Sequence, residues 1–166
     1  NTTYLIKDEK KIYLSSGIYL INKKFKKNEY YHYFIEPNNV IVVPKFKDKY
    51  IIVRQKREPI NKMNYEFPMG WVDKNEKTIN AAKRELAEET GYKSLDKPKK
   101  IKTFYADPGR GSRTCFCYYV DNLKRVSKPE KGIKIFFKTS NQLIKMINNG
   151  KFNNASHIAA FHLILR

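Results

Sequence analysis

Cysteine, histidine and acidic residues are all scarce in this chain of 166 residues. It has two cysteines, three histidines, and 16 aspartates and glutamates against 34 lysines and arginines. Two cysteines are too few for a disulfide framework. Cys115 and Cys117 stand two apart in a strand-like run, so they point to one face and are badly placed to bridge. We therefore expect two small buried thiols in a reducing compartment.

The histidines and the apolar runs exclude two further classes of protein. His32, His157 and His162 are scattered and do not have the spacing of zinc ligands, so we expect no zinc site. No run approaches the ~18 apolar residues that a membrane helix needs, so we expect no membrane partner. The length suits one domain with a small appendage.

The first residue, Asn1, is not methionine. We expect a processed or trimmed chain, upstream of which a targeting signal could lie. Our expectation is a cytoplasmic protein, or an organellar one if such a signal has been removed.

The formal net charge of +18 predicts polyanionic partners: nucleic acid, an acidic membrane or phosphorylated metabolites. Only seven of the 34 basic residues are arginine, and the lysines are spread along the whole chain. This spread is typical of a compositional bias. A metabolite enzyme with a basic shell is therefore favoured over a dedicated RNA surface.

The pattern of apolar residues predicts a β block followed by a larger mixed domain. Strands are expected at 11–14, 17–21 and 29–36, and then at 40–44, 50–54, 101–106, 114–120 and 133–137. A turn signal at residues 37–39 divides an N-terminal antiparallel β block, residues 1–37, from a main domain, residues 38–166. Two late helices are expected at 141–149, with Ser140 as its cap and Gly150 after its end, and at 155–165.

The last helix is expected to be amphipathic, with Ile158, Phe161, His162 and Leu165 on its apolar face. Strands with a helix between them, followed by late helices, predict an α/β sandwich with a mixed sheet.

The segment from Gly70 to Tyr92 concentrates acidic residues in this basic chain. Six of the 16 acidic residues fall between Glu66 and Glu89. Glu85, Glu88 and Glu89 stand at i, i+3 and i+4, so they share one face of a predicted helix and should repel each other. Either they form a solvated acidic face, or a hard divalent cation neutralises them.

Two stretches before this segment could contribute to the same site. Residues 54–57, Arg-Gln-Lys-Arg, are either a phosphate clamp or a solvated strand end. Glu66 lies in an apolar strand, where an unpaired carboxylate is costly, and Arg57 is its expected partner. Gly70 permits a backbone conformation that could turn the carbonyl of Met69 toward a metal ion.

The acidic segment resembles the Nudix box. The matching residues, with their spacing intact, are Gly70, Glu76, Arg84, Glu85, Leu86, Glu88, Glu89 and Gly91; only Tyr92 departs, being aromatic. The resemblance implies a Nudix-type α/β/α sandwich and hydrolysis of a diphosphate bond attached to a nucleoside. It implies Mg²⁺, or Mn²⁺, held by Glu85, Glu88 and Glu89 with the carbonyl of Met69. Glu88 and Glu89 are then catalytic, and Gly70, Glu76, Arg84 and Gly91 are structural.

Outside the box, the chain resembles ADP-ribose pyrophosphatases and related nucleoside-diphosphosugar hydrolases. The stretches concerned are residues 54–57, 66–70, 104–109 and 143–163. This implies release of AMP and ribose 5-phosphate from ADP-ribose, with Arg54, Arg57, Glu66 and Arg110 holding the substrate. It also implies Glu130 as a catalytic base or extra metal ligand, and a homodimer built through the β block.

Departures from that pattern leave other substrates open. Met69 replaces an alanine, and residues 110–113 are not typical of the loop that shapes the distal half of the substrate. One alternative is a Nudix hydrolase that acts on capped or modified RNA or on another nucleotide. A non-catalytic nucleotide- or RNA-binding module is the other, although a complete set of four glutamates argues against it.

Overall fold

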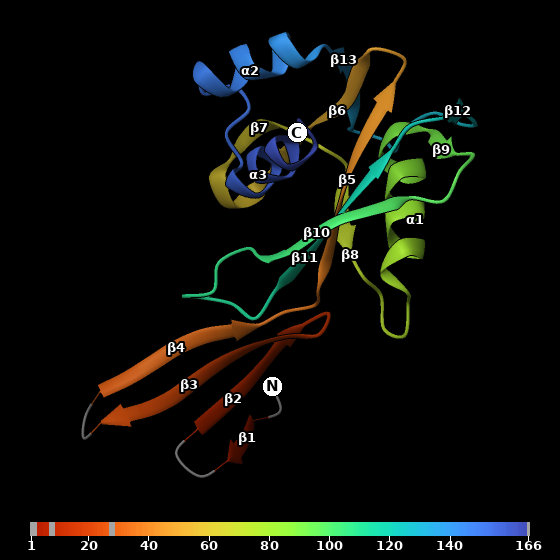
Figure 1. The fold of residues 1–166 in the computed structure, drawn as a ribbon. Coiled ribbons are helices and arrows are strands. Elements are labelled where there is room, and N and C mark those ends of the chain that lie inside the picture. The colour runs from red at the N-terminus through yellow and green to blue at the C-terminus, as the bar shows by residue number, and fades with distance from the viewer. Residues whose placement is uncertain (1–2, 7–8, 27–28, 166) are drawn as a thin grey trace. The chain divides into compact units, whose positions relative to one another are not determined.

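The computed structural model describes residues 3–6, 9–26 and 29–165. The chain forms two compact units, one built from residues 1–38 and 104–115 and the other from residues 39–103 and 116–166 (Figure 1). Each unit is described by itself below.

The first unit is a four-stranded antiparallel sheet in the order β1-β2-β3-β4. Its strands are β1 (Thr3–Ile6), β2 (Glu9–Ser15), β3 (Ile18–Lys26) and β4 (Glu29–Ile35). Ser16 and Gly17 make the β2–β3 turn with φ of 47° and 78°, which is the positive backbone geometry that a tight hairpin requires. Ile21 of β3 is fully buried, and most other described side chains of this four-stranded sheet are partly or well exposed.

The loop at 104–115 belongs to this unit because it pairs with β4. The amide of Phe34 donates to the carbonyl of Arg110 at 2.8 Å, and the amide of Ser112 donates to the carbonyl of Phe34 at 2.9 Å. The Tyr31 hydroxyl also donates to the carbonyl of Gly109. The sequence analysis assigned residues 104–115 to the main domain, because loop residues give no signal that they pair with a strand as distant in the chain as β4.

The second unit is built on a mixed seven-stranded sheet with the path β10-β11-β5-β6-β13, to which β7 and β8 add. Its strands are β5 (Asn39–Phe46), β6 (Lys49–Arg57), β7 (Lys62–Glu66), β8 (Met69–Trp71), β10 (Lys99–Tyr105), β11 (Thr114–Val120) and β13 (Lys134–Lys138). The short strands β9 (Tyr92–Ser94) and β12 (Leu123–Arg125) pair separately. Neither strand is among those expected from the sequence.

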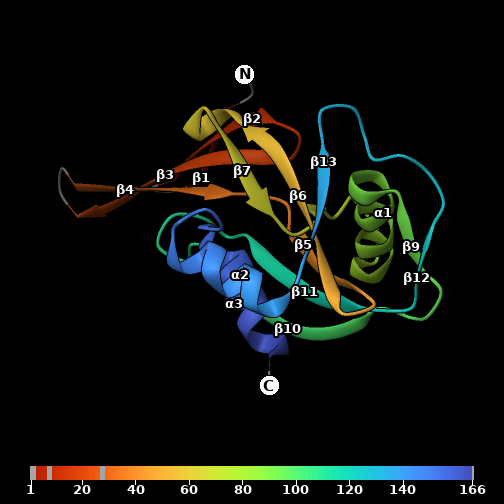
Figure 2. The ribbon, with the colours of Figure 1, turned by 90° about the horizontal axis from the view of Figure 1, so that it is seen from above.

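Helices cover both faces of this sheet, as Figure 2 shows. The helices are α1 (Thr78–Thr90), α2 (Ser140–Asn148) and α3 (Ala155–Ile164), with a short 3-10 helix η1 (Glu58–Ile60). Val42, Ile51 and Leu86 belong to the core between the sheet and α1. On the other face, Tyr50 meets Phe161 of α3 edge to face, with ring centroids 5.3 Å apart.

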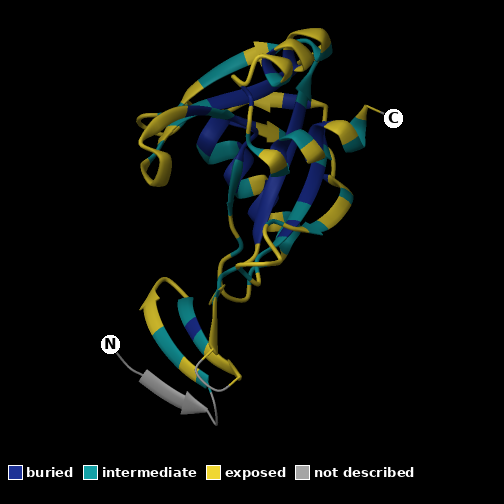
Figure 3. Cartoon of the chain, turned by 90° about the vertical axis from the view of Figure 1, so that its left-hand side faces the viewer, coloured by how far each residue is buried: buried dark blue, intermediate teal, exposed yellow. Residues whose placement is uncertain are grey.

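Burial is concentrated along the central strands of this unit (Figure 3). The predicted α/β sandwich with a mixed sheet and a small antiparallel sheet is confirmed. Cys115 and Cys117 are buried in β11, as predicted.

Two details of the late helices correct the sequence analysis. Thr139, and not Ser140, caps α2, since its hydroxyl accepts from the amide of Gln142 at 3.3 Å and its amide donates to the Gln142 side chain at 3.0 Å. The buried face of α3 carries His157, Ala160 and Phe161, whereas His162 and Leu165 are exposed. Because α3 is mostly apolar, its sequence shows no clear helical periodicity of apolar and polar residues, and packing decides which face is buried.

Among the described residues, no helix has the length and apolar character needed to cross a membrane.

Candidate active site

Helix α1 presents the three adjacent carboxylates, but it buries them unequally. Glu85 and Glu89 are 8% and 6% exposed, whereas the Glu88 side chain is 42% exposed. The helix is anchored by Leu86 and its neighbours, and it ends at Gly91, whose φ of 74° is easily adopted by glycine. One face of α1 therefore carries two buried carboxylates and a more exposed one.

Both carboxylate oxygens of Glu89 are held. Oε1 accepts from the side-chain amide of Gln55 at 3.0 Å, and Oε2 accepts from the backbone amide of Met69 at 3.0 Å. Burial raises the pKa of Glu89 to about 7, because the loss of water outweighs the stabilisation from these two donors. Glu89 is thus fixed in direction and titrates near neutral pH.

Glu85 lies against the backbone of Gly70. A Cβ added to Gly70 would stand 1.9 Å from the Glu85 carboxylate, so only glycine fits there. Burial raises the pKa of Glu85 despite a hydrogen bond from Arg84, and the charges of Glu88 and Glu130 act in the same direction as burial. A cation placed here would remove this cost.

Arg84 joins the start of α1 to the carboxylates. Its guanidinium reaches Glu76 at 2.9 Å, Glu85 at 2.6 Å and Glu88 at 3.2 Å, and it also donates to the carbonyl of Trp71 at 2.8 Å. The carboxylates of Glu76, foremost, and of Glu85 raise the pKa of Arg84. The contacts with Glu76 and Trp71 tie the 71–76 loop to the helix.

Glu66 and Arg57 form the ion pair that the sequence predicted. Glu66 is 1% exposed, and both of its oxygens accept from Arg57, with Nε at 3.0 Å from each. Asn64 donates to the same carboxylate at 2.9 Å. Burial alone would raise the pKa of Glu66, but these hydrogen bonds and the charge of Arg57 hold it below its usual value.

Arg54 does not join this cluster. Side chains alternate along β6, so Gln55 and Arg57 face Glu89 and Glu66, whereas Arg54 lies on the other face, 5.4 Å from the ring of Tyr65. Arg54 and Arg57 therefore do not form one phosphate clamp. The sequence grouped them because they are close in the chain, and strand alternation separates them.

Comparison with known proteins shows the family to which this chain belongs. The profile of the NUDIX domain matches residues 21–139, which is more than half of the chain. The chain belongs to the NUDIX family. Proteins of this family generally use divalent metal ions.

This NUDIX chain is similar to one known protein in sequence and to another in structure. It is 30% identical over 112 residues to the ADP-ribose pyrophosphatase of Bacillus subtilis, which covers 64% of this chain. The chain spans 60% of that relative's length, less than two thirds. A crystal structure of an ADP compounds hydrolase superposes with a TM-score of 0.78 at 20% identity, over 99% of this chain and 93% of the other, which shows a shared fold.

The carboxylates of this NUDIX domain suit a hard cation by their chemistry. Glu85 and Glu89 are buried with raised pKa values, and Glu88 stands beside them on α1. Within the described part of the chain, no three His, Cys, Asp or Glu side chains are already arranged to hold a metal ion by themselves. Carboxylate oxygens are nevertheless the ligands that a hard ion such as Mg²⁺ takes, and Mg²⁺ usually completes its shell with water and substrate phosphate.

Glu130 and Arg110 are the two other predicted site residues, and the charge of Glu130 acts on Glu85. The amide of Glu130 donates to the carbonyl of Glu88 at 2.9 Å, which holds the 126–130 loop at the end of α1. Arg110 belongs to the first unit, in the loop that pairs with β4. The roles of Glu130 and Arg110 stay predictions, as does that of the Met69 carbonyl as a metal ligand.

The sequence missed Gln55, Asn64 and His157. His157 is fully buried in α3, and its Nδ1 accepts from the amide of Phe67, next to Glu66, at 2.9 Å. Burial lowers the pKa of His157 to about 4, so it is neutral at pH 7. Gln55 was visible in the Arg-Gln-Lys-Arg stretch, but His157 lies 90 residues from its partner and only the fold brings them together.

Proposed function

We propose that this protein is a Nudix pyrophosphohydrolase that uses Mg²⁺ to hydrolyse the diphosphate bond of a nucleoside diphosphate derivative. The proposed substrate is ADP-ribose, and the products are AMP and ribose 5-phosphate. The proposal depends above all on Glu89, a buried carboxylate that Gln55 and Met69 hold in place beside Glu85. The B. subtilis relative supports the choice of substrate.

A bound divalent ion would neutralise the diphosphate charge and lower the pKa of the attacking water. Glu85, Glu88 and Glu89, with the Met69 carbonyl, are the ligands we propose. Gly70 and Arg84 hold these groups in place, since the Glu85 carboxylate packs on Gly70 and Arg84 contacts Glu85 and Glu88.

Three carboxylates are proposed to handle the proton of the attacking water. Glu89 titrates near neutral pH, which is where a general base works best. Glu88 is the most exposed of the α1 carboxylates, and the backbone of Glu130 is held beside it. We assign the catalytic role to Glu88, Glu89 and Glu130 together.

Arg57 is proposed to hold a substrate phosphate. Glu66 engages its Nε and Nη2, which orients the guanidinium and leaves Nη1 to donate to an anionic oxygen. Glu66 would then act through Arg57, or accept from a substrate hydroxyl.

The test is a metal and substrate panel on the wild type and Glu89→Gln. We expect Mg²⁺-dependent release of AMP from ADP-ribose, and a loss of several orders of magnitude in kcat for Glu89→Gln with an unchanged circular dichroism spectrum. Glu58→Gln is the control, because Glu58 is exposed and pairs with Lys56 outside the site. Full turnover by Glu89→Gln would reject the assignment of Glu89.

The metal and substrate panel also tests the alternative functions. The charge of +18 is the observation behind the RNA alternative. If capped or modified RNA is the substrate, it would be cleaved in preference to ADP-ribose, with affinity falling steeply with salt. Binding of nucleotide without turnover of any substrate would indicate a non-catalytic module.

We also propose that the first unit mediates a homodimer. Phe25, Tyr30 and Tyr31 of β3 and β4 are 69%, 55% and 47% exposed, and aromatic side chains are enriched at protein interfaces. Light scattering of the wild type and of Phe25→Ser with Tyr30→Ser should give the mass of a dimer and of a monomer, respectively.

A further inference from the structure

A cavity beside Arg54 is lined by residues of β6 and β7 and of the segment after α2. Its volume is about 430 Å³, and its charged lining residues are Arg54, Lys62 and Lys151. Among the residues that the structure describes, no aspartate or glutamate lines it. Three cations without a carboxylate repel each other, so the cavity has a positive potential that an anion would relieve.

Arg54 provides the second observation. Its guanidinium lies over the ring of Tyr65, and its Nε is buried with no hydrogen-bond acceptor in the described structure. A buried donor without a partner costs roughly 1–3 kcal/mol, so native structures rarely leave one. An oxygen of a bound anion would supply the missing acceptor.

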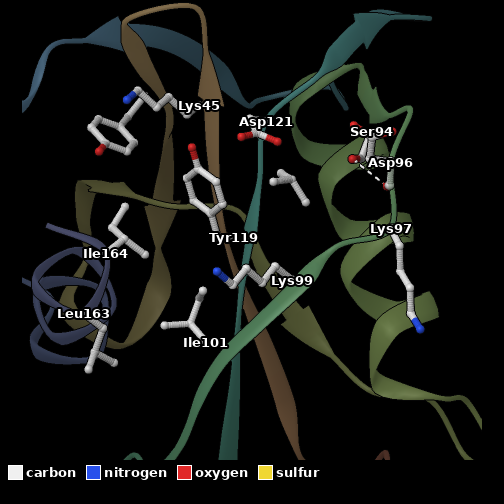
Figure 4. A pocket seen from close by; sticks show the side chains of 12 residues that line it. Lys45, Ser94, Asp96, Lys97, Lys99, Ile101, Tyr119, Asp121, Leu163 and Ile164 are labelled. Atoms are coloured by element: carbon white, nitrogen blue, oxygen red, sulfur yellow. Dashed lines mark hydrogen bonds between the residues drawn. The ribbon is translucent and has the colours of Figure 1, made fainter. Parts of the chain in front are cut away.

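Basic lining alone would prove little in a chain with 34 lysines and arginines. The cavity in Figure 4 shows the contrast, because Lys45, Lys97 and Lys99 line it together with Asp96 and Asp121. Its carboxylates balance most of the positive charge there. The Arg54 cavity differs by lacking such carboxylates and by holding an unpaired buried donor.

We propose that the Arg54 cavity binds a phosphomonoester, that is, a small organic molecule with a terminal phosphate. A phosphomonoester carries close to two negative charges at neutral pH, which matches three cations better than the single charge of a diester does. Arg54 offers planar donors that suit a phosphate. Ile60 and Met63, which are 53% and 43% exposed at the rim, provide an apolar wall for the organic group.

This site goes beyond the proposed hydrolysis and needs no metal ion. Its lining is linked to side chains that position the carboxylates. Arg54 precedes Gln55, which holds Glu89, and Asn64, which also lines the cavity, donates to Glu66. A phosphorylated metabolite bound here would therefore lie beside Asn64 and one residue away from Gln55, two side chains that position the active site.

The experiment is calorimetric titration of AMP, ribose 5-phosphate and inorganic phosphate in EDTA, with adenosine as the ligand without phosphate. We expect the phosphomonoesters to bind more tightly than inorganic phosphate, and adenosine not to bind. Arg54→Gln and Lys151→Gln should each weaken binding at least tenfold. Lys99→Gln is the matched control, since it removes one charge from the cavity in Figure 4, and it should change the affinity less than twofold.

Four results would overturn the site. The first is binding that requires Mg²⁺, which would place the phosphate at the carboxylates, and the second is an equal loss of affinity in Lys99→Gln, which would indicate only the general charge of the protein. The third is binding of adenosine as tight as that of AMP. The fourth is displacement of AMP by an oligonucleotide without terminal phosphates. Lys151 is exposed, so Lys151→Gln tests the site even if Arg54→Gln is unstable. None of these measurements uses turnover, so they are independent of whether ADP-ribose is hydrolysed.

Discussion

The carboxylate of Glu85 occupies the space that a side chain on Gly70 would need. Even one methyl group at Gly70 would approach the carboxylate to within 1.9 Å, far inside van der Waals contact. The chain can therefore place Glu85 on the β8 backbone only if residue 70 is glycine.

Gly70→Ala should disable the site while the fold survives. The methyl group would push Glu85 away from Arg84 and Glu89, so we expect a fall in kcat of at least 100-fold and a loss of roughly 1–3 kcal/mol in the free energy of unfolding from overpacking. Turnover with ADP-ribose and chemical denaturation measure the two effects. Gly109→Ala is the control, since its Cβ would stand 3.7 Å from the nearest atom, and near-normal activity of Gly70→Ala would contradict the geometry.

Removing Arg57 should destabilise the protein strongly. Arg57→Gln leaves Glu66, which is 1% exposed, without its cation, and a broken buried ion pair typically costs roughly 3–5 kcal/mol. In a double-mutant cycle by urea denaturation, Glu66→Gln should restore part of this loss. Lys56→Gln, which breaks the exposed Lys56–Glu58 pair, should cost under about 1 kcal/mol.

His157 should make the fold sensitive to mild acid. The pKa of His157 is about 4 in the folded chain, against 6.5 when it is free, so between these values the unfolded chain binds the proton and the folded chain does not. Its contribution to stability is complete above pH 6.5 and is lost as the pH falls toward 4, by roughly 3 kcal/mol. The measurement is the free energy of unfolding from pH 4 to pH 7.

His157→Asn is the matched variant, because its side-chain oxygen can still accept from the Phe67 amide and does not titrate. The stability difference between wild type and variant should shrink as the pH falls. Glu89 acts in the opposite direction, since its raised pKa of about 7 favours the folded chain as the pH falls below 7. Wild type and variant both contain Glu89, so its contribution cancels when their stabilities are subtracted. A difference that does not change with pH would show that His157 does not titrate as described.

Mg²⁺ should bind the free enzyme more tightly as the pH rises toward 7. The proton on Glu89 must leave before the carboxylate can bind a cation, so the Kd should fall about tenfold per pH unit below 7 and level off above it. The shift in Tm with added Mg²⁺ measures this without substrate. Glu89→Gln should remove the steep pH dependence, and EDTA should abolish turnover of the wild type.

The sequence predicted the parts of this site that depend on local spacing. A helical face defines the group of Glu85, Glu88 and Glu89, and a buried carboxylate in an apolar strand requires a cation, so Arg57 was the correct partner for Glu66. These inferences succeeded because each depends on neighbours in the chain or on a strong electrostatic cost.

What the sequence could not predict depends on contacts between distant segments. Unequal burial of Glu85 and Glu88 follows from the packing of β8 against α1, and the partner of His157 is 90 residues away. The cap of α2 was misplaced by one residue, because Thr139 and Ser140 are both good caps and the choice depends on the backbone.

The end of α1 limits where the chain can accept new residues. The amides of Val126 and Ser127 both donate to the carbonyl of Gly91, and a side chain on Gly91 would collide with the carbonyl of Ser127 at 2.3 Å. Gly132, a few residues later, has open space around it. An insertion at Gly132 would therefore lengthen the loop between Ser127 and β13 and leave the contacts at Gly91 intact.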